Sequence, residues 1–145
     1  MSSQSRLTLA FPSDVKHVDL LHTLSDTVSG EVGFTEDQAL NLALAVREAA
    51  INAVKHGNAL DARKKVIVSF EFGGPDVVVT VEDRGTGFDP EKTPDPTRPE
   101  NLHRASGRGF LLMKSFVDEV DVLPRPGGGN IVRLVKHAPG SGNGA

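Results

Sequence analysis

Apolar residues along the 145-residue chain recur with two different periods, which predicts a mixture of strands and helices. Some short runs alternate or are rich in β-branched residues, as strands are, and some longer runs repeat at helical spacing. The predicted strands are residues 6–11, 65–72, 77–82, 119–123 and 130–136, and the predicted helices are residues 15–30, 35–55 and 109–117. Hairpins beside helices predict an α/β two-layer sandwich, with helices covering one face of a mixed, mostly antiparallel sheet.

The ends of the first two predicted helices have recognisable signals. Ser13 and Asp14 offer an N-cap for the first helix, which we expect to end at Gly30. Thr35 opens the second, and Gln38 stands at the spacing of a capping box. His-Gly-Asn at residues 56–58 is a stop signal.

Residues 84–106 contain several prolines and almost no apolar periodicity. A loop of this length inside a compact domain is usually functional or disordered. We expect a single domain over residues 1–137, with a lid at about residues 88–106, followed by a flexible Gly-rich tail at residues 138–145.

Composition narrows the functional classes. The net charge is −3, and the chain lacks Trp and Tyr, so we expect no direct contact with nucleic acid. Cysteine is absent, which excludes disulfides and thiol chemistry. The N-terminal residues contain no apolar signal segment and no apolar run is long enough to span a bilayer, so we expect a cytoplasmic protein without a membrane partner.

The second predicted helix carries polar residues along one line of an otherwise apolar surface. Asn41, Glu48, Asn52 and His56 are spaced by seven, four and four residues. A carboxylate and an amide on a buried stripe are costly unless they are paired or face a ligand. Glu48 and Asn52 can therefore point into one pocket, although the same spacing also occurs on the solvated face of an ordinary helix.

Two glycine-containing segments are further candidates. Asp83 ends a strand and is followed by Gly85 and Gly87, a pattern that lets a flat ligand approach the backbone and also occurs in ordinary tight turns. Gly107 and Gly109 open the third predicted helix, where free amides can meet phosphate oxygens, although glycine can also simply relieve crowding there. Neither segment fits a dinucleotide fingerprint or a Walker sequence.

The three segments together resemble a known family. REAAINAVKHGN, VEDRGTGFDP and GRGFLLMKSFVDEV, in this order, are similar to the ATP-binding segments of the GHKL superfamily, whose module has the Bergerat fold. The closer resemblance is to its anti-sigma-factor serine/threonine kinases, over about residues 6–136. The resemblance implies ATP and Mg²⁺ as cofactors, with Asn52 binding the ion and Glu48 acting as the base for the attacking hydroxyl.

The resemblance also assigns the nucleotide contacts. It implies that Asp83 binds the adenine amine, that Gly85 and Gly87 shape the base and ribose pocket, and that amides of Gly107 and Gly109 bind phosphate. Arg104 and Arg108 are candidates for the γ-phosphate or a partner. The family often has Thr in the last strand, near the adenine, where this chain has Asn130 and Ile131.

The implied activity is transfer of the γ-phosphoryl group of ATP to a serine of a STAS-type anti-anti-sigma protein, combined with sequestration of a sigma factor. A homodimer is also implied. Two other functions stay open at this point: a regulatory module that binds partners according to ATP occupancy without phosphoryl transfer, and a GHKL ATPase that uses water as the acceptor.

Overall fold

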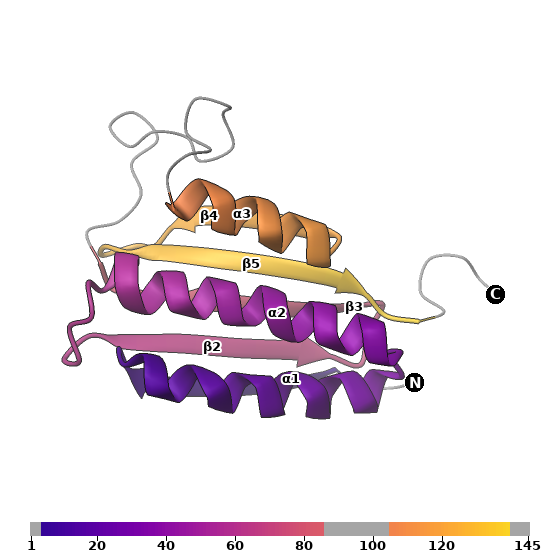
Figure 1. Ribbon diagram of the computed structural model, residues 1–145. Coiled ribbons are helices and arrows are strands. Elements are labelled where there is room, and N and C mark those ends of the chain that lie inside the picture. The colour runs from indigo at the N-terminus through magenta and orange to yellow at the C-terminus, as the bar shows by residue number, and fades with distance from the viewer. Residues whose placement is uncertain (1–3, 86–104, 140–145) are drawn as a thin grey trace.

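The computed structural model describes residues 4–85 and 105–139 (Figure 1). Its elements in chain order are β1 (Ser5–Pro12), η1 (Val15–His17), α1 (Val18–Val32), α2 (Glu36–Asn52), η2 (Ala53–Gly57), β2 (Lys65–Phe72), β3 (Asp76–Glu82), α3 (Ala105–Phe116), β4 (Glu119–Pro124) and β5 (Asn130–His137). Within these described residues, no helix combines the length and the apolar character that a membrane span requires.

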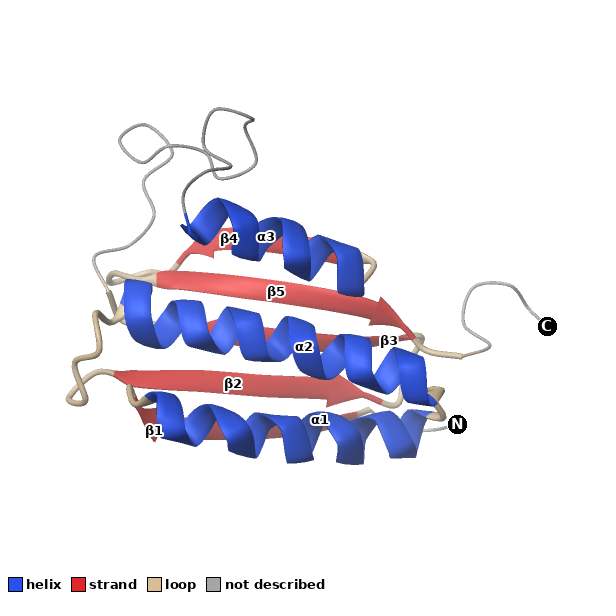
Figure 2. Ribbon diagram, viewed as in Figure 1, coloured by secondary structure: helices blue, strands red, loops and turns tan. Residues whose placement is uncertain are grey.

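The strands form one sheet in the order β1-β2-β3-β5-β4. Every neighbouring pair in it is antiparallel. The three α-helices lie over the same face of the sheet, with α2 between α1 and α3 (Figure 2). The architecture is the predicted α/β two-layer sandwich. The sheet is entirely antiparallel rather than mixed, and β5 lies between β3 and β4.

The core lies between the sheet and the helices. Alternate strand residues such as Val68, Phe70 and Leu134 point toward the helices and are almost completely buried. The face of α2 toward the sheet is made of small and branched residues, which allow the helix to approach closely: Leu42, Ala43, Ala45, Val46, Ala49 and Ala50. The helix is nevertheless not buried on all sides, since Leu40 remains 49% exposed.

Helix ends follow local hydrogen bonding. The predicted capping box is present: the Gln38 amide donates to the Thr35 hydroxyl oxygen, and the Thr35 amide donates to the Gln38 side chain. The first helix runs past its predicted end at Gly30. It ends at Gly33, whose φ of +82° is the left-handed conformation that a helix C-terminus adopts and that glycine accepts without strain.

Two boundaries next to the candidate segments also differ from the prediction. The second helix changes after Asn52 into the π-helical turn η2, in which the Asn58 amide donates to the Ala53 carbonyl over 2.8 Å. Helix α3 begins at Ala105 rather than at residue 109, so the predicted lid ends in helix. Residues 86–104, which hold the rest of that lid, lie outside the described part of the chain.

Candidate functional site

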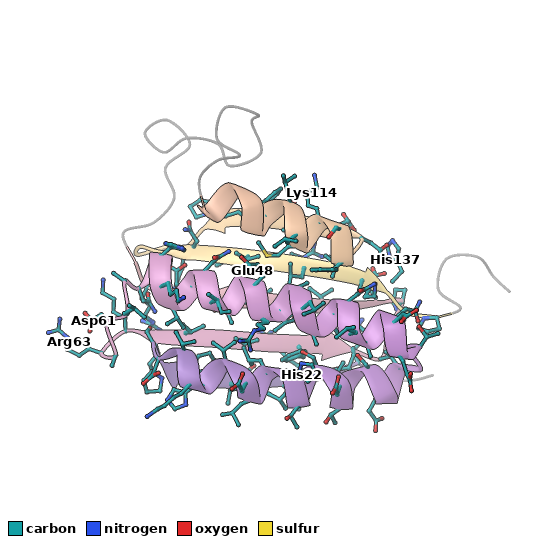
Figure 3. All side chains as sticks on the ribbon, viewed as in Figure 1. His22, Glu48, Asp61, Arg63, Lys114 and His137 are labelled. Carbon is teal, nitrogen blue, oxygen red and sulfur yellow. The ribbon has the colours of Figure 1, made fainter. Side chains whose placement is uncertain are left out.

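Helices α2 and α3 bring Glu48, Asn52 and Gly109 together. Gly109 is buried, and a Cβ placed on it would overlap Glu48 Oε1 and lie 2.8 Å from Asn52 Nδ2. Only a residue without a side chain therefore lets the N-terminal turn of α3 approach these two polar groups. Figure 3 shows Glu48 on the side of α2 that faces α3.

The two polar side chains are half-buried rather than fully solvated. Neither forms a hydrogen bond or ion pair with a side chain that the structure describes. Moving a carboxylate and a carboxamide out of water costs free energy, unless a protein group or a ligand replaces the hydrogen bonds that they made to water. Their placement favours the interpretation that they face a pocket over the alternative of a solvated helix face.

Asp83 lies at the end of β3 and is only 5% exposed. Its carboxylate oxygen Oδ1 accepts hydrogen bonds from the amides of Gly85, over 3.0 Å, and Asn130, over 3.1 Å. Burial raises the pKa of Asp83, an effect that these two hydrogen bonds and the charge of Arg125 offset only in part. No described residue donates to the second oxygen, Oδ2, which is left available as an acceptor.

The end of η2 contacts this carboxylate directly. A Cβ on Gly57 would overlap the carboxyl group of Asp83, and a Cβ on Gly85 would overlap the carbonyl of Gly57. The α2–η2 segment thus has the polar pair Glu48 and Asn52 near its middle and Asp83 at its far end. Residues 48 and 57 are nine positions apart, about 14 Å at 1.5 Å per residue.

Asn58 is a structural residue of the site that sequence reasoning treated only as a stop signal. It is completely buried, and its Nδ2 donates to Ser13 Oγ over 2.7 Å and to the Lys65 carbonyl over 3.2 Å. Its Oδ1 accepts from the Arg84 amide over 2.7 Å. Asn58 therefore holds the backbone immediately after Asp83. In the sequence, an Asn after a helix-ending Gly is compatible with this buried role, but the same pair of residues also occurs at ordinary exposed helix ends.

The remaining candidates are placed only in part. Gly107 and Arg108 lie in the first turn of α3, and only their backbone is described. Gly87 and Arg104 lie outside the described residues. Among the described residues, no group of three His, Asp or Glu side chains could hold a metal ion. Asn52 nevertheless suits Mg²⁺, which is usually bound by one or two protein oxygens together with substrate phosphates and water.

The comparison with known sequences assigns the family. The profile described as "Histidine kinase-like ATPase domain" matches residues 11–136. The chain belongs to this family. Because the family consists of ATPase domains, membership confirms the prediction that the nucleotide is ATP.

Similar proteins narrow the assignment. The anti-sigma F factor of Bacillus subtilis (strain 168) is 36% identical over 107 residues, which are 71% of this chain and 72% of that protein. The serine-protein kinase RsbW of Staphylococcus aureus is 30% identical over 133 residues, 87% of this chain and 84% of that protein. These relatives confirm the predicted resemblance to the anti-sigma-factor serine/threonine kinases.

The fold has a counterpart among solved structures. The crystal structure of the RsbU and RsbW domains of a Mycobacterium tuberculosis protein superposes with a TM-score of 0.68 at 18% identity, covering 92% of this chain and 32% of that chain. At this identity the likeness concerns the fold alone, and it agrees with the α/β sandwich described above.

Proposed function

We propose that this member of the anti-sigma-factor serine kinases transfers the γ-phosphoryl group of ATP to a serine of a STAS-type anti-anti-sigma protein and also sequesters a sigma factor. The observation that carries the proposal is the α2–η2 segment. Its middle brings Glu48 and Asn52 against the start of α3, and its end touches Asp83. One continuous helical segment thus connects a phosphate end with a base end.

At the phosphate end, each group has a role that suits its chemistry. Glu48, half-buried and without a described partner, accepts the proton of the attacking serine hydroxyl. Asn52 holds Mg²⁺ through its amide oxygen, and the ion neutralises charge on the phosphates when it is bound. The backbone amide of Gly107, in the first turn of α3, meets phosphate oxygens at the positive end of that helix, and Arg108 is a further phosphate contact. The amide of Gly109 is already within the helix that begins at Ala105, so the role of Gly109 is to let α3 approach Glu48 and Asn52.

At the base end, Asp83 accepts a hydrogen bond from the exocyclic amine of adenine. The support for this role is that Oδ1 is occupied by backbone amides, whereas no described residue donates to Oδ2. Gly85 and Gly87 border the base and ribose. Gly85 also permits the close contact between its own turn and η2.

The proposed partners follow from the relatives, one named an anti-sigma F factor and one a serine-protein kinase. A sigma factor and its STAS-type antagonist are the two protein partners, and a second copy of this chain is a third. The compartment is the cytoplasm, where sigma factors act.

The test compares the wild-type protein with Glu48→Gln and, as a matched control on the same helix, Glu36→Gln at the exposed first turn of α2. Each is incubated with Mg²⁺, ATP and purified STAS proteins from the same genome, and phosphoserine is measured by mass spectrometry. We expect Glu48→Gln to slow phosphoryl transfer about a hundredfold or more, because it removes the base, and to leave the affinity for ATP unchanged. Glu36→Gln should transfer phosphate at the wild-type rate.

Absence of phosphoserine with the wild-type protein, despite tight ATP binding, would contradict the kinase activity. If Glu48→Gln also left ATP-dependent release of the partner unchanged, the result would instead support a module switched by ATP occupancy alone.

A further inference from the structure

The backbone between η2 and β2 is strained at two residues. Ala59 and Leu60 have φ angles of +52° and +60°, and among the described residues they are the only ones other than glycine with a positive φ. A side chain disfavours this left-handed conformation, which at a helix end is usually taken by glycine. Here the glycine, Gly57, comes earlier and fits against the Asp83 carboxyl group instead. The strain therefore falls on an alanine and a leucine.

Leu60 gains no burial in return for this strain. It is 57% exposed, more than any other large hydrophobic residue that the structure describes. Its amide donates to the Val54 carbonyl over 2.8 Å, and the next amide, of Asp61, donates to the Asn58 carbonyl over 3.0 Å. An exposed leucine alone needs no explanation, but a well-anchored and strained turn that holds one in water is more typical of binding than of folding.

Basic residues surround Leu60 along the chain. Residues 55–65, here named the basic turn, contain four of the sixteen Lys and Arg residues of the protein and a single acidic residue, Asp61. That carboxylate is paired with Arg63, whose Nε and Nη2 donate to it over 3.0 Å each. Because the whole chain has a net charge of −3, this positive charge is a local feature. An exposed apolar side chain among basic ones complements an acidic surface with an apolar socket.

The basic turn lies at the end of the sheet that carries the proposed nucleotide site. It includes the end of η2, which abuts Asp83. The end of β3 and the start of α3 lie at the same end of the sheet (Figure 1), and Figure 3 shows Asp61 and Arg63 projecting beyond it. A folded domain of about 100 residues has a radius of gyration of about 13 Å. One partner that brings a serine to Glu48 is therefore wide enough to cover the basic turn as well.

We propose that the basic turn is a docking surface for the protein that carries the acceptor serine, and that this protein presents an acidic surface around an apolar socket for Leu60. The inference rests on the proposed function and deepens it. Docking holds the partner while its serine enters the pocket, so it contributes to the KM for the protein substrate and not to the transfer step. Nucleic acid is the other polyanion that a basic surface attracts, but phosphate contacts make no use of an apolar side chain.

The experiment measures binding and phosphorylation separately, with purified STAS proteins from the same genome. Calorimetry with a non-hydrolysable ATP analogue gives the Kd, and phosphoserine formation at several concentrations of the STAS protein gives kcat and KM. The variants are Leu60→Asn, in which asparagine tolerates the left-handed conformation, and Lys65→Glu, which reverses one exposed charge. Leu40→Asn is the matched control, because Leu40 is 49% exposed and lies near the opposite end of α2.

We expect Leu60→Asn and Lys65→Glu each to raise the Kd and the KM for the STAS protein about tenfold, with kcat and the affinity for ATP unchanged. The effect of Lys65→Glu should shrink as the salt concentration rises, because salt screens exposed charges. Leu60→Asn should unfold at the wild-type temperature or above it, since asparagine relieves the strain, and this separates docking from folding. Leu40→Asn should have the wild-type Kd and KM.

The outcomes separate the docking surface from the kinase activity. An unchanged Kd and KM in folded Leu60→Asn would overturn the docking surface and leave the kinase activity standing. Binding that depends on Leu60 without any phosphoserine would support the docking surface and contradict the kinase activity, and a wild-type protein that bound no STAS protein would overturn both. If the wild type retained DNA and Lys65→Glu did not, with the Kd and KM for the STAS protein unchanged, the turn would be a nucleic-acid surface instead.

Discussion

At the scale of single residues, the buried carboxyl group of Asp83 combines a proposed ligand-binding role with a cost in stability. Burial is the main cause that raises the pKa of Asp83 above 3.8. The folded protein therefore binds this proton more tightly than the unfolded chain does. The stabilising contribution of the carboxyl group is complete below the unfolded pKa and is lost as the pH rises through the folded pKa.

We predict that Asp83→Asn separates the two properties. Without nucleotide, the variant should be at least as stable as the wild type at pH 7, because a neutral amide is cheaper to bury and can still accept from the Gly85 amide. Its advantage should shrink as the pH falls toward about 4. Urea unfolding at several pH values measures this, and calorimetry should show that ATP binding is lost. If the stability advantage of Asp83→Asn over the wild type increased as the pH fell, the result would contradict a raised pKa of Asp83.

A second prediction at this scale compares two glycines. Gly57→Ala should destabilise the protein by about 2 kcal/mol and abolish ATP binding, because its methyl group would displace the Asp83 carboxylate. Gly30→Ala is the control: the site is helical and exposed with nothing within 4 Å, so it should gain about 0.5–1 kcal/mol and bind ATP normally. Thermal unfolding and ATP titration measure both variants. Equal effects of Gly57→Ala and Gly30→Ala would contradict the close contact between Gly57 and the Asp83 carboxyl group.

How far the sequence predicted these residues depended on the kind of contact. Glu48 and Asn52 share a helix face by spacing alone, so their proximity was predictable. Asp83 was predictable as the end of a β-branched strand before glycine. The bonds of Asn58 to Ser13 and to the Arg84 amide join residues 45 and 26 positions apart. Such pairs depend on the tertiary arrangement, which residue spacing does not encode.

At the scale of elements, Asn58 connects three of them at the base end. Its carboxamide bonds Ser13, which follows β1, the first residue of β2 and the Arg84 amide, which follows β3. We predict that Asn58→Ala destabilises the protein by about 3 kcal/mol, because the buried Ser13 hydroxyl and two partly buried backbone groups lose their bonds at once.

The same variant should also weaken ATP binding at temperatures where it remains folded, because the turn after Asp83 loses its anchor. Binding of inorganic triphosphate, which needs only the phosphate end, should change little. Calorimetry with both ligands distinguishes this positioning role from general destabilisation, which would lower both affinities together.

Element boundaries were predictable where a single residue has one strong local preference. Thr35 and Gln38 form the predicted capping box. Gly30 resembled a helix end equally well in sequence, but the left-handed turn occurs at Gly33. The early start of α3 was hidden because residues 105–108 carry little hydrophobic periodicity.

At the scale of the whole molecule, the layers were predictable and the strand order was not. Each hairpin predicts its own pair, but the insertion of β5 between β3 and β4 depends on pairing between residues 49 to 61 positions apart. The result is a sheet with helices on one face and no described helix on the other (Figure 2). That second face includes Ile67, Val78 and Ile131, all partly exposed.

We predict that this second face of the sheet forms the proposed homodimer. Thr80 lies near its centre, paired with Ser69 of β2 and Arg133 of β5. In a two-fold interface the same surface contacts itself, so Thr80→Arg would bring two like charges together and out of water. The dissociation constant of the dimer should rise about a hundredfold or more, which light scattering over a concentration series measures. The control is Thr27→Arg on the exposed surface of α1, which should form dimers as the wild type does. This face would be excluded as the interface if the wild-type protein were a monomer, or if Thr80→Arg formed a dimer with undiminished affinity.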